Sequence, residues 1–343
     1  MVRIPRRDAG AHRRAGLLAR RSRLRRGRHG RGAPAPRRRR HHSRPRRAAA
    51  ARAARRQEPR THPARLAQGR HPAQCRGAGL ALQGRVRDLT GDPALPLLFA
   101  IGDVHGRRDL LAALLAAVEV EAERLGKPPR LIFLGDIIDR GPESRQALDL
   151  VVAALAEHAG SKLILGNHEE FLLDFLDNAE NRESAARNWF ANGGLATLKS
   201  YKFGETERID TIAAHFARDF PGHVAAMRAA DWMVETERHV FVHGGIDPHV
   251  SHSTQDPGTT RWIRHDFLDW RGSLPKAVVH GHTPTDSCLP EVHPNRIALD
   301  TGAVFSGHLT CVIFDDGTPP RFLATDDSGG EITVAEVDPV VFG

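Results

Sequence analysis

The sequence has only three cysteines, Cys75, Cys288 and Cys311, and no pair of them has the C-x-x-C spacing. This scarcity argues against a disulfide framework and against a cysteine-ligated zinc site. No apolar run approaches the ~20 residues that a membrane span needs. The basic start is not followed by the apolar core of a secretory signal. These absences predict a cytoplasmic protein without a membrane span.

Charge is distributed unevenly along the 343 residues, whose formal net charge is +9. The first 90 residues hold 28 Arg, no Lys and only three acidic residues, so they carry a net charge of about +25. The rest of the chain carries about −16. Because the positive charge is confined to the first quarter, the high pI does not indicate that the folded part binds nucleic acid.

The first quarter consists of Arg, Ala, Pro, Gly and His with almost no Val, Ile or Phe. Such a stretch cannot bury enough apolar surface to offset the entropy of ordering it, so we expect residues 1–92 to be a disordered leader. One interpretation is a tail that binds nucleic acid or an acidic membrane. The absence of Lys and of interleaved aromatics argues against nucleic-acid contact. We favour translated upstream sequence with a true start nearer Val86 or Leu89, although no Met lies between Met1 and Met227.

The remaining ~250 residues are enough for one domain with its own core, and we predict a single α/β catalytic domain over residues 93–343. Five apolar runs of strand length each end in a Gly and an Asp, Asn or His. The motifs that follow these runs begin at Gly102, Gly135, Gly166, His243 and His280. Open α/β sheets bind their ligands at the carboxyl ends of strands, so the motifs predict a site there.

Helical stretches over 109–125 and 142–158 separate the first three runs, which predicts βαβ units with parallel neighbouring strands. The region 171–236 is expected to be mostly helical and to form a wall of the site. Three later runs are expected to complete a sheet as antiparallel strands. They are Arg296–Asp300, Leu309–Phe314 and Arg321–Leu323.

Six side chains in the motifs offer metal ligands: two carboxylates, one amide oxygen and three imidazoles. They are Asp103, Asp136, Asn167, His105, His243 and His282. The set has too much nitrogen for a Ca²⁺ cage and too much oxygen for a structural zinc site. It suits two divalent ions, roughly 3.5–4 Å apart, that clamp a phosphoryl group and hold a hydroxide nucleophile. Any one motif alone is usually only a turn, and their recurrence after five strands is what indicates a site.

The same motifs resemble those of the calcineurin-like metallophosphoesterases, and within them the bacterial phosphoprotein phosphatases. The resemblance covers about residues 97–305 and rests on GDVHG, GDIIDRG, GNHE, HGG and GH. It implies the calcineurin-like fold, an α/β β-sandwich of mixed sheets flanked by helices. It also implies two sets of metal ligands. The first set is Asp103, His105 and bridging Asp136, and the second is Asp136, Asn167, His243 and His282.

The resemblance further implies that His168, oriented by Asp139, is the catalytic acid. Arg140 and Asn167 would hold the substrate phosphate. The further substrate Arg of the eukaryotic members has no counterpart motif here, but the segment Trp262–Phe267 resembles one of the bacterial members. This makes Arg264 the expected second phosphate ligand.

The expected function is therefore hydrolysis of phosphoserine or phosphothreonine in proteins by a metal-bound hydroxide. Mn²⁺ is the expected metal, with Fe²⁺ or Zn²⁺ as alternatives. A symmetrical dinucleoside tetraphosphate hydrolase would use the same ligands and differ in the wall of the pocket. An alternative that is not an enzyme is a non-catalytic anion-binding protein tethered through the basic tail.

Overall fold

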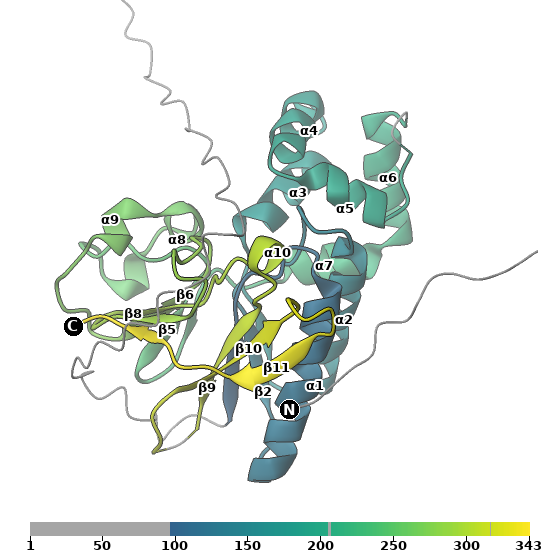
Figure 1. The fold of residues 1–343 in the computed structure, drawn as a ribbon. Helices are drawn as coiled ribbons and strands as arrows, with labels where there is room; N and C mark the ends of the chain where they lie inside the picture. The colour runs from purple at the N-terminus through teal and green to yellow at the C-terminus, as the bar shows by residue number, and fades with distance from the viewer. Residues whose placement is uncertain (1–96, 205–206, 316) are drawn as a thin grey trace, which may run out of the picture. The chain divides into compact units, whose positions relative to one another are not determined.

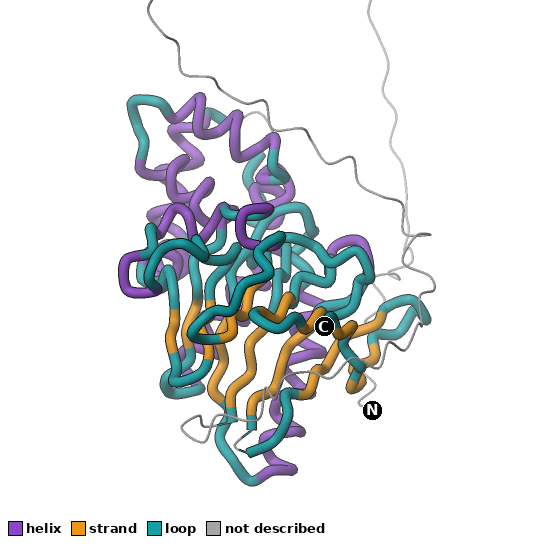
Figure 2. Tube along the Cα trace, turned by 90° about the vertical axis from the view of Figure 1, so that its left-hand side faces the viewer, coloured by secondary structure: helices purple, strands orange, loops and turns teal. Residues whose placement is uncertain are grey.

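The computed structural model describes residues 97–204, 207–315 and 317–343. The predictions for the Arg-rich leader and for a domain boundary at residue 93 lie outside these segments. In the described residues, two six-stranded sheets face each other across an apolar core, and helices cover their outer faces (Figure 1, Figure 2). The predicted β-sandwich of mixed sheets flanked by helices is confirmed.

The first sheet has the strand order β11-β10-β9-β1-β2-β3. Its strands are β1 (Leu98–Ile101), β2 (Arg130–Phe133), β3 (Lys162–Leu163), β9 (Thr310–Phe314), β10 (Arg321–Asp326) and β11 (Thr333–Glu336). β1, β2 and β3 are parallel neighbours, as the βαβ spacing predicts. β9 pairs antiparallel with β1, and β10 pairs antiparallel with β9, which confirms two of the three later strands.

The second sheet has the strand order β12-β7-β8-β6-β5-β4. Its strands are β4 (Val234–Glu235), β5 (His239–Phe241), β6 (Ala277–His280), β7 (Glu291–Val292), β8 (Arg296–Ala298) and β12 (Val340–Val341). The prediction that the run from Arg296 is an antiparallel strand of the same sheet is wrong, because β8 runs parallel to β6. A tight hairpin after β7 reverses the chain, so β7 takes the antiparallel place beside β8.

Side chains of the central strands alternate between two apolar layers. In β1, Leu98 and Ala100 point into the core between the sheets, while Phe99 and Ile101 point towards the helices. Both layers are closed to water, and all four residues are fully buried. This explains why the strand appears in the sequence as an unbroken apolar run rather than as an alternating one.

Helices α1 (Arg108–Leu125) and α2 (Ser144–Glu157) contact the first sheet and match the predicted stretches within two residues. The predicted helical wall is confirmed as five helices. They are α3 (Asn167–Asp177), α4 (Arg182–Ala191), α5 (Gly194–Ser200), α6 (Ile209–Asp219) and α7 (Pro221–Arg228). Short helices α8 (Pro257–Trp262) and α9 (His265–Leu268) lie over the outer face of the second sheet, and α10 (Ala303–Ser306) precedes β9. No helix among the described residues is long and apolar enough to cross a membrane.

Candidate metal centre and active site

The predicted motifs meet at the carboxyl ends of β1, β2 and β3 in the first sheet and of β5 and β6 in the second. The side chain of His243, after β5, reaches the first sheet, and its Nδ1 lies 2.8 Å from the carbonyl oxygen of Leu134. The backbone N–H of His282, after β6, donates to both carboxylate oxygens of Asp103 at 3.1 Å. The five motifs therefore converge, although they come from two sheets.

The loops after β1 and β2 are hydrogen-bonded to each other. The carbonyl oxygen of Asp136 accepts from the N–H groups of Val104 and His105, at 3.1 and 2.8 Å. In return, the N–H of Gly141 donates to the carbonyl of His105 at 3.0 Å. A Cβ at Gly141 would lie 2.1 Å from that same oxygen, so only glycine allows the two loops to approach this closely.

Five site residues adopt positive φ angles, in a backbone region that residues other than glycine rarely occupy. They are His105 (46°), Asp136 (51°), Asp139 (73°), Arg140 (67°) and His282 (67°). Each such residue costs about 1–3 kcal/mol unless its surroundings hold it there, and strain of this kind gathers at functional sites. Glycine would relieve the strain, so these positions favour an interpretation in which the side chains themselves are needed.

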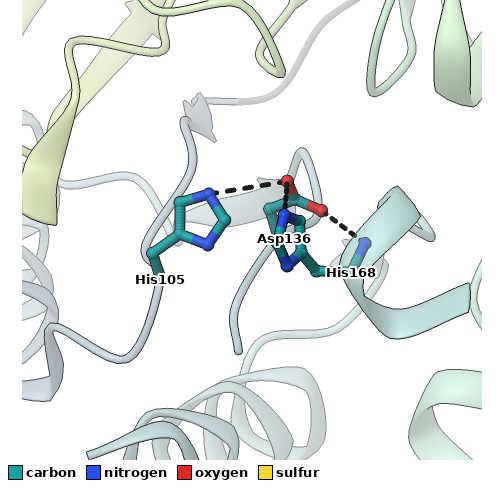
Figure 3. Close-up of side chains that lie close together, drawn as sticks. All are labelled: His105, Asp136 and His168. Atoms are coloured by element: carbon teal, nitrogen blue, oxygen red, sulfur yellow. Dashed lines mark hydrogen bonds and ion pairs between the residues drawn. The ribbon is translucent and has the colours of Figure 1, made fainter. Parts of the chain in front are cut away.

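A first group of possible metal ligands consists of His105, Asp136 and His168 (Figure 3). Nδ1 of His105 lies 2.9 Å from the carbonyl of Ile138, to which it can donate. The lone pair then lies on Nε2 of His105, which is 3.6 Å from Oδ2 of Asp136 and 2.6 Å from Nη1 of Arg140. Burial and the neighbouring Arg140 lower the pKa of His105 well below its usual range, which keeps this lone pair available.

A second group surrounds the other oxygen of Asp136. Nε2 of His243 lies 3.3 Å from Oδ1 of Asp136, 2.9 Å from Oδ1 of Asn167 and 3.1 Å from Nδ1 of His282. Nδ1 of His282 also lies 2.8 Å from the Asn167 oxygen. All four side chains are buried. Asp136 thus belongs to both groups, as expected of a bridging ligand.

The donor set of the second group fits a cation. Nδ1 of His243 donates its hydrogen to the carbonyl of Leu134. In the neutral ring, Nε2 therefore carries a lone pair, and this lone pair faces the oxygens of Asp136 and Asn167. Lone pairs that converge in this way repel each other unless a proton or a metal ion lies between them. Burial lowers the pKa of His243, but the carboxylate of Asp136 outweighs it and raises the value to about 9. This shows how strongly the site attracts positive charge.

Asp103 lies behind these groups. Both of its oxygens accept from the N–H of His282, and burial together with the nearby Asp300 raises its pKa well above the usual range. Asp103 is absent from both compact ligand groups of the described residues, and His168 stands in the first group where the resemblance implies Asp103. Nε2 of His168 is 3.8 Å from Oδ2 of Asp136.

The carboxylate of Glu169 holds the loop that carries Asp136. Its Oε2 accepts from the N–H groups of Asp136 and Gly166, at 2.8 and 3.1 Å. Its Oε1 accepts from Ile137 and Ile138, at 2.8 and 3.3 Å. Burial, with the charge of Asp136, raises the pKa of Glu169 to about 7. The sequence analysis includes this residue in the GNHE motif but assigns it no role.

We expect Glu169→Gln to lower both stability and metal affinity. Glutamine has one acceptor oxygen, so its NH₂ group would face buried N–H donors, and each unpaired donor costs about 1–3 kcal/mol. The displaced loop should reduce metal affinity about 10–100-fold, as the loss of supporting contacts around metal ligands does. Thermal unfolding and metal titration test this. Glu157→Gln, on the exposed end of α2, is the control, and equal behaviour of the two variants would contradict the role.

His168 and Asp139 form a buried pair. Nδ1 of His168 lies 2.7 Å from Oδ2 of Asp139. The indole N–H of Trp189 donates to both oxygens of Asp139 at 3.0 Å, and the hydroxyl of Thr197 donates to Oδ1 at 2.6 Å. These donors fix the direction of the carboxylate. From the sequence, Trp189 is expected only to pack in the core and Thr197 has no predicted role, because hydrogen-bond partners supplied by distant helices leave no local motif.

Arg140 and Arg264, the predicted phosphate ligands, are both exposed at the mouth of the site. Nη1 of Arg140 lies 2.6 Å from Nε2 of His105. Nη1 of Arg264 donates to the hydroxyl of Thr283, next to His282, at 3.1 Å. Desolvation lowers the pKa of Arg264, and the groups that act on it include Asp103 and Arg140. The structure therefore brings both arginines to the metal centre.

Comparison with known proteins finds relatives that are phosphatases and dinucleoside tetraphosphatases by name. Serine/threonine-protein phosphatase 1 of Salmonella typhimurium is 26% identical over 222 residues, which cover 62% of this chain and 89% of that protein. An asymmetrical bis(5'-nucleosyl)-tetraphosphatase of Geobacillus thermodenitrificans is 28% identical, covering 64% and 90%. A symmetrical bis(5'-nucleosyl)-tetraphosphatase of Janthinobacterium is 27% identical, covering 64% and 93%. The sequence model of the calcineurin-like phosphoesterases matches residues 97–311, and the chain belongs to this family.

Proposed function

We propose that the chain hydrolyses phosphate monoesters at a dinuclear metal centre, with phosphoserine and phosphothreonine in proteins as its substrates and residues 93–343 as its catalytic domain. The observation that carries this proposal is the convergence of two ligand groups on the two oxygens of Asp136, beside a His–Asp pair and two arginines. A non-catalytic anion-binding protein would have no use for that pair.

The ions of this proposal are two Mn²⁺, and the first would draw Asp103 into the group of His105 and Asp136. One would be held by Asp103, His105 and Asp136, and the other by Asp136, Asn167, His243 and His282. When bound, such ions withdraw charge from the phosphoryl oxygens and lower the pKa of the attacking water. The donor atoms are buried, so water competes poorly for them and their charges are screened less than in water.

The side chains around the ligands supply the other steps. Arg140 and Arg264 would bind the phosphate through planar N–H forks, and Asn167 is placed to assist them. His168 would donate the proton of its Nε2 to the leaving oxygen, and its Nδ1, 2.7 Å from Oδ2 of Asp139, holds the ring in the orientation for that transfer. Asp139 therefore acts as a positioning residue for the catalytic acid.

A protein-bound phosphate is favoured because both arginines are exposed while the ligands behind them are buried. A phosphoryl group on a short side chain can reach such a site without entering a deep cavity. The Salmonella relative is named for this activity. The test is to assay the Mn²⁺-loaded protein in parallel on a phosphoserine peptide, p-nitrophenyl phosphate and diadenosine tetraphosphate. Hydrolysis of none of the three would overturn the proposal.

One observation favours symmetrical hydrolysis of dinucleoside tetraphosphates as a second candidate. Trp262 is 43% exposed, and its ring centroid lies 6.1 Å from that of His282 and 5.3 Å from that of Phe171. Its indole N–H donates to Glu170, and this carboxylate also accepts from Arg261, both at 2.6 Å. An exposed indole held in one orientation offers a face on which a nucleobase can stack at little entropic cost.

We expect Trp262→Ala to separate the two substrate classes. Stacking of a base on an aromatic side chain contributes about 1–3 kcal/mol, so KM for diadenosine tetraphosphate should rise roughly tenfold or more. KM for a phosphoserine peptide should not change. Trp262→Phe, which keeps an aromatic face, is the matched control and should retain most of the affinity. An equal loss on both substrates would instead indicate that Trp262 only supports the fold of α8.

A further inference from the structure

A cavity with a mostly apolar wall lies at the end of the second sheet opposite the metal ligands. Its volume is about 350 Å³, and its walls include Trp270, Arg271, His293, Arg296 and Phe342. β8 begins at Arg296 and leads to Asp300, whose charge acts on Asp103 of the metal centre. Four residues of extended chain span ~13 Å, so this cavity is separate from the proposed active site. We call it the hairpin pocket, after the β7–β8 turn that carries Arg296.

Two residues that line the hairpin pocket, Arg296 and Trp270, carry buried donors that lack acceptors. The side chain of Arg296 is nearly enclosed, with the residue 6% exposed. Its Nε and Nη1, and Nε1 of Trp270, have no hydrogen-bond partner within the described chain. A buried charge without a partner is strongly unfavourable, and each unpaired donor adds to the cost. These three nitrogens are donors only, so what they lack is an acceptor.

Positive charge predominates around these donors. Arg271 also lines the cavity, and neither it nor Arg296 forms an ion pair with any described residue. The nearest acid of the turn, Glu291, is bonded to Nε2 of His293 at 3.1 Å. The carboxyl-terminal residue Gly343 lies in the wall. Burial and the charge of Arg271 lower the pKa of Arg296 to about 10, against the opposing effects of Glu291 and Asp269.

The walls of the hairpin pocket are held in place by their own contacts. The side-chain amide of Asn295 donates to the carbonyls of Trp270 and Gly272, both at 3.2 Å. The rings of His293 and Phe342 stack with centroids 4.3 Å apart and planes 1° from parallel. The pocket is thus formed before any ligand arrives, which lowers the entropic cost of binding.

We propose that the hairpin pocket binds a small organic molecule that carries an oxyanion, either a phosphate or a carboxylate. Both groups present several acceptor oxygens and no obligatory donor, which matches the unpaired N–H groups of Arg296 and Trp270. The volume exceeds that of a lone anion and is at the small end of ligand pockets, so the aromatic rings of Trp270 and Phe342 have room to contact an organic part.

The test is to titrate adenosine monophosphate, inorganic phosphate and citrate separately into the protein, following intrinsic fluorescence and thermal unfolding. At saturation, the ligand that fits should raise Tm by roughly 5 °C. Arg296→Met should raise its Kd at least tenfold and leave phosphatase activity unchanged, and Trp270→Phe, which removes the N–H together with the five-membered ring that carries it, should raise Kd several-fold. Arg140→Ala removes one of the proposed phosphate-binding side chains of the active site and should leave anion binding in the hairpin pocket intact.

Each outcome bears on the proposal. A response to adenosine monophosphate or phosphate alone assigns the pocket to phosphates, and a response to citrate alone assigns it to carboxylates. If no anion stabilises the protein, or if Arg296→Met binds as tightly as the unaltered chain, the proposal is wrong. A response lost in Arg140→Ala would place the anion in the active site and would also overturn it. Because binding is read without turnover, failure here does not affect the proposed phosphatase activity.

Discussion

Asp136→Asn is expected to abolish both metal binding and hydrolysis. The two oxygens of Asp136 face different ligand groups, with Oδ2 near His105 and Oδ1 near His243. An amide keeps one neutral oxygen and turns an NH₂ group towards the other set of lone pairs. The loss of several kcal/mol of charge stabilisation corresponds to a decrease of ~10³-fold or more in kcat. Metal analysis after dialysis and steady-state kinetics with added Mn²⁺ measure the two effects.

The matched control for this prediction is Asp174→Asn, which makes the same change on the exposed side of α3. It should leave metal content and kcat as they are. Retention of two metal ions and a near-normal rate by Asp136→Asn would contradict the two-metal proposal. Loss of only one ion would show that Asp136 is not shared between the groups.

His168→Ala is expected to lower kcat on a phosphoserine peptide by about 10²–10⁴ while metal content remains unchanged. The alkoxide of serine needs a proton as it leaves, and His168 is the buried imidazole that Asp139 orients. The loss on p-nitrophenyl phosphate should be much smaller, because nitrophenolate leaves without a proton. The comparison of the two substrates therefore isolates proton transfer from binding.

The same variant also distinguishes two roles that the geometry allows for His168. Its Nε2 lies near enough to Asp136 to contribute a metal ligand instead of a proton. In that case His168→Ala would lose a metal ion and would be equally slow on both substrates. His215→Ala, on α6 away from the metal centre, controls for the loss of an imidazole elsewhere. Asp139→Asn should reproduce the leaving-group dependence in weaker form, because it changes only the orientation and charge of His168.

The sequence by itself determined the parts of this protein that depend on neighbouring residues. The runs at Leu98–Ile101 and Leu131–Leu134 are apolar throughout because both faces of these strands are buried, and that pattern is visible without a structure. The glycines and polar residues after each run mark where the chain must turn and where ligands gather. Parallel pairing followed from the spacing of the βαβ units, since a crossover of that length returns the chain to the same edge.

Only the tertiary structure decided which groups act on the motif residues. β8 was assigned to the wrong pairing because a strand of three residues gives no information about its partner, and the hairpin after β7 fixed its direction. The functional interpretations of Glu169, Trp189 and Trp262 depend on hydrogen-bond partners that lie 31, 50 and 92 positions away along the chain. The unpaired donors of Arg296 are likewise invisible in a sequence. Hydrogen bonding and burial are properties of the assembled chain, and residues far apart in sequence supply most of the partners at this site.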